Sequence, residues 1–418
     1  MDAQVITGRV VTMAEAGSID DGVVAIERGT LAFVGRREDL PERFAPIPPQ
    51  AFPLITPGLC DAHTHSAWVG SRHGEYMQKL RGEGYEAIAA RGGGIVASMR
   101  AIEEADLDTI TETLVARLRR MAALGVTTVE VKTGYGLRRA LEEKQLEAIA
   151  EASRADGVPR VVPTLLALHA LPPEARGDES LRAAYVASVI ELVRASRDRA
   201  RFVDAYVDRN AFRVDEARAV MQVARDVGLG VRMHIGQFAD VGGAELAAEL
   251  GARSADHLEN VGPSGLAALA GADVAAVLLP IASFVLGQAP PDIEALRKAK
   301  IRLIVASDAN PGTAPSESLP LAMAFAARLY GLSTEEILAG VTREAARSLD
   351  VQTGLVAGRP ADLVGWDLPH EEALLQPWGT SRAAIVLVDG RPLAFPGSGR
   401  TKEGTDPTVR SFAASSGR

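Results

Sequence analysis

The chain has 418 residues, of which 47% are hydrophobic and 24% are charged, and its formal net charge is −9 at pH 7. This composition predicts a globular protein with room for one large and one small domain, and the negative charge argues against nucleic-acid binding. The single cysteine, Cys60, allows no internal disulfide, as expected in a reducing compartment. The sequence has neither a basic, apolar leader nor an apolar run of membrane-spanning length, and we therefore expect a cytoplasmic protein.

The two ends of the chain share one pattern, short strands separated by turns. Strands are expected at residues 5–6, 23–26, 31–34, 361–366 and 384–390. This pattern predicts a small β-sandwich domain built from residues 1–56 and 352–396. The tail, residues 397–418, is polar and rich in glycine and serine, and we expect it to be mobile.

Between these ends, residues 57–351 alternate strand and helix patterns. Eight strands are expected, at 59–65, 126–132, 161–169, 202–207, 230–234, 253–257, 274–279 and 301–307. Eight strands alternating with helices favour a (β/α)8 barrel of the TIM type, in the α/β class. A doubly wound sheet is the competing architecture. It requires a glycine-rich phosphate loop after a strand, whereas the three glycines at 92–94 do not follow one.

Side chains able to bind a metal recur where the expected strands end. These side chains are His63, His65, His169, His234, His257 and Asp308. The first two belong to the run PGLCDAHTH at 57–65, and residues i and i+2 of a strand point to the same side. Each histidine taken singly is best explained as an ordinary, partly buried side chain. Their common position at the end of the barrel that carries active sites nevertheless indicates a functional site.

Four of these side chains form a donor set for one divalent metal: His63, His65, His234 and Asp308. Three imidazoles and a carboxylate suit Zn²⁺ or Fe²⁺, and we expect Zn²⁺ ahead of Fe²⁺. The cation would lower the pKa of water toward about 7, and Asp308 could accept a proton from that water. His257 is expected to orient the water or to stabilise the developing oxyanion. The fourth expected strand of the barrel, at 202–207, has no lysine, so a lysine carbamate that bridges two metals is not expected.

Several motifs resemble the amidohydrolase superfamily and, within it, the imidazolonepropionase family. They are PGLCDAHTH (57–65), GSR (70–72), the segment from Tyr85 to GGGI (92–95), VTTVEVKTGYG (126–136), HALP (169–172), GGAEL (242–246), SADHL (254–258) and DANPG (308–312). The resemblance covers nearly the whole chain. It implies a hydrolase of histidine degradation that opens 4-imidazolone-5-propanoate to N-formimino-glutamate, with water attacking the carbon between the two ring nitrogens. It also suggests a homodimer.

The resemblance further implies which residues bind this small anionic, heterocyclic substrate. The positions that hold its propionate are matched by Arg72, Tyr85 and Tyr135. The positions around its ring are matched by His169, His257 and Asn310. A guanidinium pairs bidentately with a carboxylate, which agrees with this role for Arg72. By themselves, however, Arg72 could be a solvated surface residue, the tyrosines ordinary packing residues, and Asn310 part of an Asn-Pro turn.

The chain departs from the family pattern after His234, where an acidic residue usually follows two or three places on. Here the run is HIGQ, and the amide of Gln237 can form hydrogen bonds but cannot shuttle a proton at pH 7. Residues 280–286 also contain fewer aromatic side chains than is usual in the family. The fourth expected strand of the barrel, at 202–207, is followed by Asp208, where the family tends to have Glu. We therefore place Gln237 in the catalytic set with Asp308 and His257.

These departures motivate an alternative reaction, in which sulfide is released from 3-(5-oxo-2-thioxoimidazolidin-4-yl)propionate to give hydantoin propionate. A deaminase of the same superfamily is a further possibility, but Arg72 and Tyr135 favour a ring that carries a carboxylate. A non-catalytic metal-binding homologue is the last alternative. The four intact metal ligands argue against it.

Overall fold

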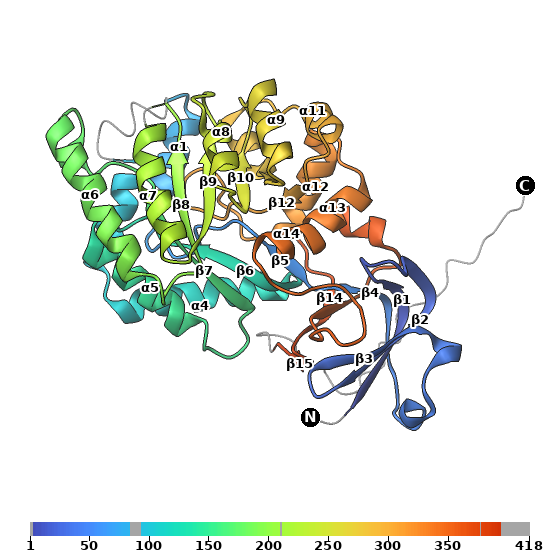
Figure 1. Ribbon diagram of the computed structural model, residues 1–418. Coiled ribbons are helices and arrows are strands. Elements are labelled where there is room, and N and C mark those ends of the chain that lie inside the picture. Colours follow the sequence, from blue (N-terminus) through green and yellow to red (C-terminus); the bar gives the residue numbers. More distant parts are fainter. Residues whose placement is uncertain (1–2, 84–92, 210, 377, 394–418) are drawn as a thin grey trace, which may run out of the picture.

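The computed structural model describes residues 3–83, 93–209, 211–376 and 378–393, and two sheets organise this part of the chain (Figure 1). One sheet has eight strands and the other has seven. Within the described residues, no helix combines the length and the apolar character needed to cross a membrane.

The eight-stranded sheet is parallel, and strands that are consecutive in the sequence are neighbours in it. Its strands are Leu59–Asp61 (β5), Val126–Lys132 (β6), Arg160–Leu168 (β7), Phe202–Val207 (β8), Gly230–Ile235 (β9), Ser254–His257 (β10), Ala275–Leu278 (β11) and Leu303–Val305 (β12). All eight agree with the expected positions to within a few residues. The prediction of a (β/α)8 barrel rather than a doubly wound sheet is confirmed.

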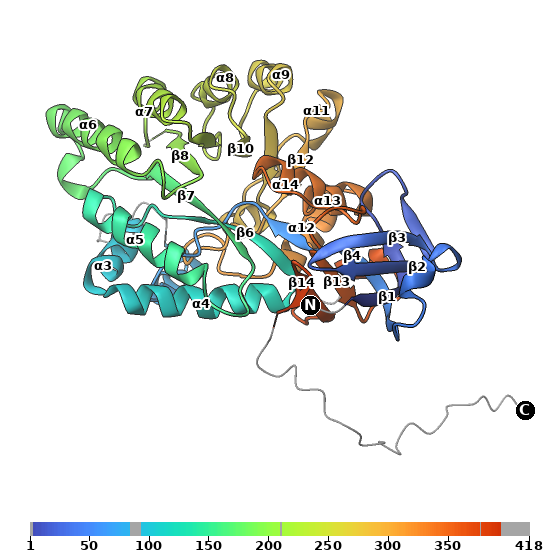
Figure 2. The ribbon, with the colours of Figure 1, turned by 60° about the horizontal axis from the view of Figure 1, so that its bottom comes forward.

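Helices surround this sheet on its outer side (Figure 2). They are His73–Leu80 (α1), Ile95–Glu104 (α3), Leu107–Ala123 (α4), Arg139–Ala152 (α5), Glu179–Ala195 (α6), Val214–Asp226 (α7), Gly243–Glu249 (α8), Pro263–Gly271 (α9), Pro280–Leu286 (α10), Ile293–Lys298 (α11), Leu319–Tyr330 (α12), Thr334–Gly340 (α13) and Arg343–Ser348 (α14). The main hydrophobic core lies between the helices and the strands, and includes Leu114, Val129, Leu165, Val203 and Met221.

The first and last strands of the barrel meet just beyond their ends. The backbone N–H of Asp308 donates to the carbonyl of His63, and that of His65 donates to the carbonyl of Ala309, both at 3.0 Å. Below these bonds, the hydroxyl of Ser307 donates to Asp61 at 2.6 Å. This closure places Asp308 beside two histidines that precede it by more than 240 positions.

The seven-stranded sheet combines both ends of the chain, as expected. Its strands are Gln4–Val11 (β1), Ser18–Glu27 (β2), Thr30–Arg36 (β3), Gln50–Pro57 (β4), Leu363–Trp366 (β13), Ala383–Val388 (β14) and Arg391–Pro392 (β15). The strand β4 joins the two halves, since it pairs parallel with β1 and antiparallel with β13. The domain limits named above stay predictions, and residues 397–418 lie outside the described part of the chain.

Trp366, at the end of β13, fastens this sheet to the barrel. Its indole N–H donates to Thr56 at 2.9 Å, and the side chain is buried. The ring packs on Gly125, the residue before β6, where an added Cβ would lie 2.5 Å from it. Gly125 also has φ +94°, a conformation that favours glycine. The sheet of chain ends therefore packs against the start of β6.

Candidate metal centre and active site

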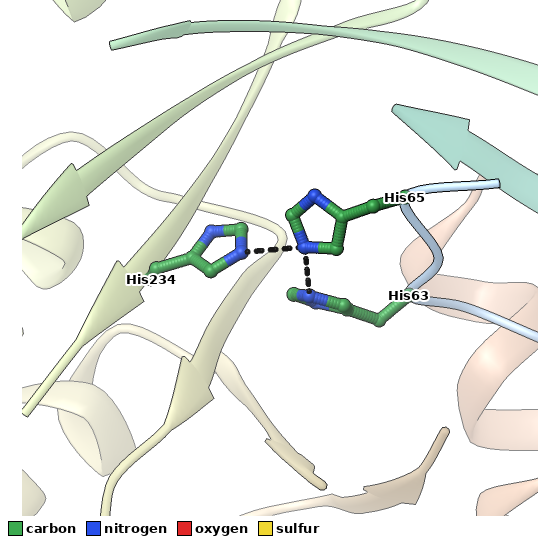
Figure 3. Close-up of side chains that lie close together, drawn as sticks. All are labelled: His63, His65 and His234. Carbon is green, nitrogen blue, oxygen red and sulfur yellow. Dashed lines mark hydrogen bonds between the residues drawn. The ribbon is translucent and has the colours of Figure 1, made fainter. Parts of the chain in front are cut away.

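Three imidazole nitrogens converge at the end of the barrel strands (Figure 3). His63 and His65 follow β5, and His234 lies in β9. The Nε2 atom of His65 is 3.3 Å from the Nε2 atoms of His63 and of His234. Oδ1 of Asp308 completes the set, 3.4 Å from Nε2 of His63 and 3.4 Å from Nε2 of His65.

These separations fit a tetrahedral metal site. Zinc binds nitrogen and oxygen ligands at about 2.0–2.1 Å, which places tetrahedral donors about 3.3–3.4 Å from one another. All four side chains are buried, and the three histidines together form a group able to hold an ion. The donor set expected from the sequence is therefore brought together, and its spacing suits a divalent cation.

The hydrogen bonds behind the rings point to the same conclusion. Nδ1 of His63 lies 2.7 Å from Asp256, and Nδ1 of His234 lies 3.1 Å from Asp204. Each carboxylate holds the ring proton on Nδ1, which leaves a lone pair on Nε2. The Nε2 lone pairs of His63 and His234 then both face Nε2 of His65. If that atom carried a proton, it could donate a hydrogen bond to only one of the two. A cation among the three nitrogens satisfies all of them at once.

Asp308 itself is held as an anion. Burial raises its pKa, but the hydrogen bonds with His63 and His65 outweigh burial and bring the pKa of Asp308 well below its ordinary value. Its backbone is in the left-handed region, with φ +55°, and His257 has φ +82°. Residues other than glycine rarely adopt this conformation except where the surrounding structure imposes it, commonly at functional sites.

Comparison with known proteins identifies the family. Residues 54–393 match the Amidohydrolase family. The imidazolonepropionase of Bradyrhizobium sp. (strain BTAi1) is 41% identical over 388 residues, which cover 89% of this chain and 94% of that protein. The imidazolonepropionase of Paracoccus denitrificans is 40% identical over 395 residues, covering 91% and 98%. The chain belongs to the imidazolonepropionase family of amidohydrolases.

A solved structure shares the fold of this imidazolonepropionase-family protein. The atrazine chlorohydrolase of Arthrobacter aurescens, complexed with zinc, superposes with a TM-score of 0.69 at 18% identity, covering 94% of this chain and 95% of that one. The likeness extends over both the barrel and the sheet of chain ends.

His169 and Tyr135, both expected to contact the substrate, lie beside the donor set. His169, which follows β7, stacks on His65 with ring centroids 5.3 Å apart. Burial and the neighbouring His65 lower the pKa of His169 to about 3, so its ring is neutral. Its Nδ1–H donates to the carbonyl of Gly134 at 2.7 Å, which leaves Nε2 as an acceptor. Tyr135 is buried, and its ring centroid lies 5.5 Å from that of His169.

His257 also lies within the group of imidazoles. Its ring centroid is 5.6 Å from that of His234 and 6.1 Å from that of His63. Its Nδ1 forms no hydrogen bond among the residues that the structure describes, but it lies 3.7 Å from a carboxylate oxygen of Glu259. The ring is therefore buried beside the donor set, with a carboxylate near its Nδ1.

Arg72 carries an ion pair that the sequence did not suggest. Its Nε and Nη2 donate to one oxygen of Glu75, at 3.0 and 2.8 Å, and the backbone N–H of Gly94 donates to the same oxygen at 3.1 Å. The guanidinium also packs against Gly312, four residues after Asp308, where an added Cβ would lie 2.5 Å from Nη1. Arg72 is therefore near the rim of the site, and a carboxylate already occupies it.

Gln237, Asn310 and Tyr85 are the remaining residues expected in the site, and the structure describes the first two. The side-chain oxygen of Gln237 accepts from the hydroxyl of Tyr206 at 2.9 Å. Asn310 uses its amide within its own turn, donating to the carbonyl of Asp308 at 2.7 Å and accepting from the N–H of Thr313 at 2.7 Å. A contact between Asn310 and the substrate ring stays a prediction. Tyr85 lies outside the described residues.

Sequence reasoning missed the charged side chains that support the site from inside the barrel. They are Glu130, Lys132, Asp256 and Arg232, all buried. It also missed Glu142, which accepts backbone N–H groups from Gly134, Gly136 and Leu137 and so holds the loop that carries Tyr135. A usable signal existed in β6, where two charged residues, two positions apart, stand in an otherwise uncharged strand and must share one face.

Proposed function

We propose that this protein is an imidazolonepropionase, which hydrolyses 4-imidazolone-5-propanoate to N-formimino-glutamate. The observation that carries the proposal is the buried set of three imidazoles and one carboxylate, with neighbouring donor atoms 3.3–3.4 Å apart. The choice of substrate is supported by the relatives named imidazolonepropionase, which are about 40% identical over about 90% of the chain.

A divalent cation bound there would lower the pKa of water from 15.7 toward about 7. The ionised carboxylate of Asp308 lies at the same point and can accept a proton from that water. His257, whose ring lies beside those of His63 and His234, can orient the water or donate to the oxygen that develops negative charge. The neutral ring of His169 presents Nε2 as an acceptor, which suits an N–H group of the imidazolone ring. Burial of these groups keeps bulk water away from the proton transfers.

The propionate arm is assigned to Arg72, Tyr135 and Tyr85. Arg72 supplies a guanidinium that can pair bidentately with a carboxylate. In the structure it pairs with Glu75, and the propionate would share or displace that contact. Gln237 is assigned to the ring end of the site, where Tyr206 fixes the orientation of its amide. Asn310 is assigned to the substrate ring, which it would reach from the turn after Asp308 that its amide stabilises.

Nothing in the structure or in the comparisons favours the release of sulfide from a thiohydantoin. The relatives described above carry the name imidazolonepropionase. A non-catalytic role is not favoured either, since all four side chains of the donor set are buried together.

The proposal is tested by incubating the zinc-loaded protein with 4-imidazolone-5-propanoate. We expect loss of the imidazolone absorbance and formation of N-formimino-glutamate, detected by mass spectrometry. The thioxo analogue serves as a parallel substrate, with sulfide release as its readout. Sulfide release without imidazolone turnover, or no turnover of either compound by fully metal-loaded protein, would overturn the proposal.

Several finer assignments accompany this function. We propose Zn²⁺ ahead of Fe²⁺ as the bound metal, a place in histidine degradation, a homodimer and a cytoplasmic location. The donor set accepts both metals, so reconstitution of metal-free protein with each ion and comparison of kcat would decide between them. Light scattering during gel filtration would establish the oligomeric state.

A further inference from the structure

A lysine is buried directly behind the metal-binding histidines. Lys132 is the last residue of β6, and its side chain is fully buried. Its Nζ donates to Glu130 and to Asp204, both at 2.7 Å, and lies 3.9 Å from Asp256. Although burial lowers its pKa, Asp204 and Glu130 outweigh burial and raise the pKa of Lys132 above its ordinary value. Three buried carboxylates therefore share one ammonium group.

Two of these carboxylates orient metal-binding imidazoles. Asp204 uses one oxygen for Lys132 and the other for Nδ1 of His234, at 3.1 Å. Asp256 places a single oxygen between Lys132 and Nδ1 of His63, 2.7 Å from the imidazole. The ammonium group of Lys132 therefore contacts both carboxylates that orient His234 and His63.

The third carboxylate holds the loop that carries the other ligands. Glu130 binds Lys132 through Oε1, and its Oε2 accepts the backbone N–H of Thr64 at 3.2 Å. Thr64 lies between the two histidines of the HxH motif, and its hydroxyl donates to the carbonyl of Glu130 at 2.7 Å. Through this carboxylate, Lys132 is connected to the backbone of the HxH motif as well.

Lys132 fixes where these carboxylates stand. Its ammonium donates to one oxygen of Asp204 at 2.7 Å, while the other oxygen of Asp204 meets Nδ1 of His234 at 3.1 Å. Removal of the ammonium would take away the hydrogen bond that fixes this carboxylate, and the second oxygen would no longer be held against the imidazole. Glu130 would lose the same donor, and with it part of its hold on the backbone of Thr64.

We propose that Lys132 is a positioning residue of the metal centre: its ammonium holds Asp204 and Asp256 where they meet Nδ1 of His234 and of His63, so that Nε2 of both rings faces the metal. The inference rests on the metal centre of the proposed function. A buried lysine can also serve only to neutralise its neighbours, and removal of such a residue destabilises a protein without acting on a particular ligand. The experiment must separate these two roles.

The test is a double-mutant cycle read out as zinc affinity. Lys132→Met, Asp204→Asn and the double variant are prepared as full-length protein without metal, and the Kd for Zn²⁺ is measured by competition with a chromophoric chelator. Leu165→Ala on β7, which removes buried apolar side-chain atoms and no charge, is the control for general destabilisation. The visible spectrum of the Co²⁺-loaded proteins reports the geometry of the ligands.

We expect Lys132→Met to weaken zinc binding by about 10- to 100-fold, as for other residues that orient metal ligands, and to alter the Co²⁺ spectrum. The effect should be clearly smaller when Asp204→Asn is already present, because part of it passes through that carboxylate and the rest through Asp256 and Glu130. Leu165→Ala should lower the melting temperature but leave the zinc Kd within about 3-fold. If Lys132→Met does not fold, Lys132→Gln, whose side chain is one atom shorter and cannot place a donor at the position of Nζ, is measured with the same expectation.

Two results would overturn the inference: a zinc Kd for the lysine variants within about 3-fold of the unsubstituted protein, or effects of the two substitutions that simply multiply. Neither readout uses substrate. Unchanged zinc affinity with normal imidazolone hydrolysis would remove only the role of Lys132, whereas absent hydrolysis with the expected affinities would remove only the proposed function.

Discussion

The proposed function gives Asp308 two roles at one position, as a metal ligand and as the base that accepts a proton from water. Its contacts of 3.4 Å with His63 and His65 fit the first role. Its strongly lowered pKa keeps the carboxylate charged throughout the neutral pH range. Substitution by asparagine separates the two roles, since the amide keeps an oxygen of similar placement but cannot accept a proton.

We therefore expect Asp308→Asn to keep part of its metal and to lose kcat by about 10²- to 10⁴-fold, the usual contribution of a general base. Metal content by mass spectrometry and kcat per bound metal are the measurements. Asp350→Asn is the matched control, because this carboxylate contacts Arg201 and Arg253 just before the starts of β8 and β10, whereas the donor set lies at the ends of the strands. A near-normal kcat per bound metal would show that another group accepts the proton.

Arg72 and Glu75 lead to a second prediction at the same scale. In the structure the guanidinium is paired with Glu75, so the substrate's propionate must share or replace that contact. We expect Arg72→Ala to raise KM by about 10- to 100-fold, corresponding to the loss of a hydrogen bond between charged groups. We expect Glu75→Gln to lower KM by about 2- to 5-fold, because a competing ion pair is removed.

Steady-state kinetics of both variants, with Arg81→Ala at the exposed end of the same segment as control, test this pair of predictions. Changes in kcat should be small beside those in KM. If KM rises in Glu75→Gln, Glu75 supports substrate binding instead of competing with it. An unchanged KM in Arg72→Ala would place the propionate elsewhere.

At the scale of elements, the outer helices are joined by ion pairs that depend on pH. Glu216 near the start of α7 accepts from Arg182 on α6 at 2.5 and 2.6 Å and from the backbone N–H of Arg213 at 2.8 Å. Burial raises its pKa, but these hydrogen bonds outweigh burial and lower the pKa of Glu216 to about 2. Ionised Glu216 therefore stabilises the folded state above about pH 4.5, and this contribution is lost as the pH falls toward 2.

We expect Glu216→Gln to lower the melting temperature at pH 7 and to have a smaller effect at pH 3, where the native carboxylate has lost part of its advantage. Thermal unfolding at the two pH values is the measurement. Glu191→Gln, which removes an exposed ion pair from α6, should change little at either pH. An equal loss at both pH values would mean that the side chain acts through packing alone.

At the scale of the whole molecule, the metal centre combines side chains from the first, fifth and eighth strands of the barrel. His63 and His65 follow β5, His234 lies in β9, and Asp308 follows β12. A cation that binds only the folded arrangement stabilises it by about 4 kcal/mol at a free concentration 1,000 times its Kd.

Removal of the metal with a chelator should therefore abolish hydrolysis and lower the melting temperature, and both should return on addition of Zn²⁺. Calorimetry and activity before and after chelation test this expectation, with Mg²⁺ addition as control because its preference for oxygen ligands does not suit three imidazoles. A melting temperature and activity that do not respond to chelation would contradict a metal centre at this position.

Much of this protein follows from its sequence alone. The alternation of strand and helix patterns predicts the barrel, because apolar periodicity is a local property that each segment carries by itself. The HxH motif, His234 and Asp308 are recognisable because each stands at the end of an expected strand, and barrel topology brings strand ends together.

Only the tertiary structure determines the partners of those residues. The pairing of Arg72 with Glu75, the turn that occupies Asn310 and the group around Lys132 depend on side-chain directions that no residue pattern specifies. Asp204, Asp256 and Glu130 lie on different strands, and the closure of the barrel brings their carboxylates around one ammonium. Buried charges must find partners at short range, and those partners exist only once the chain has folded.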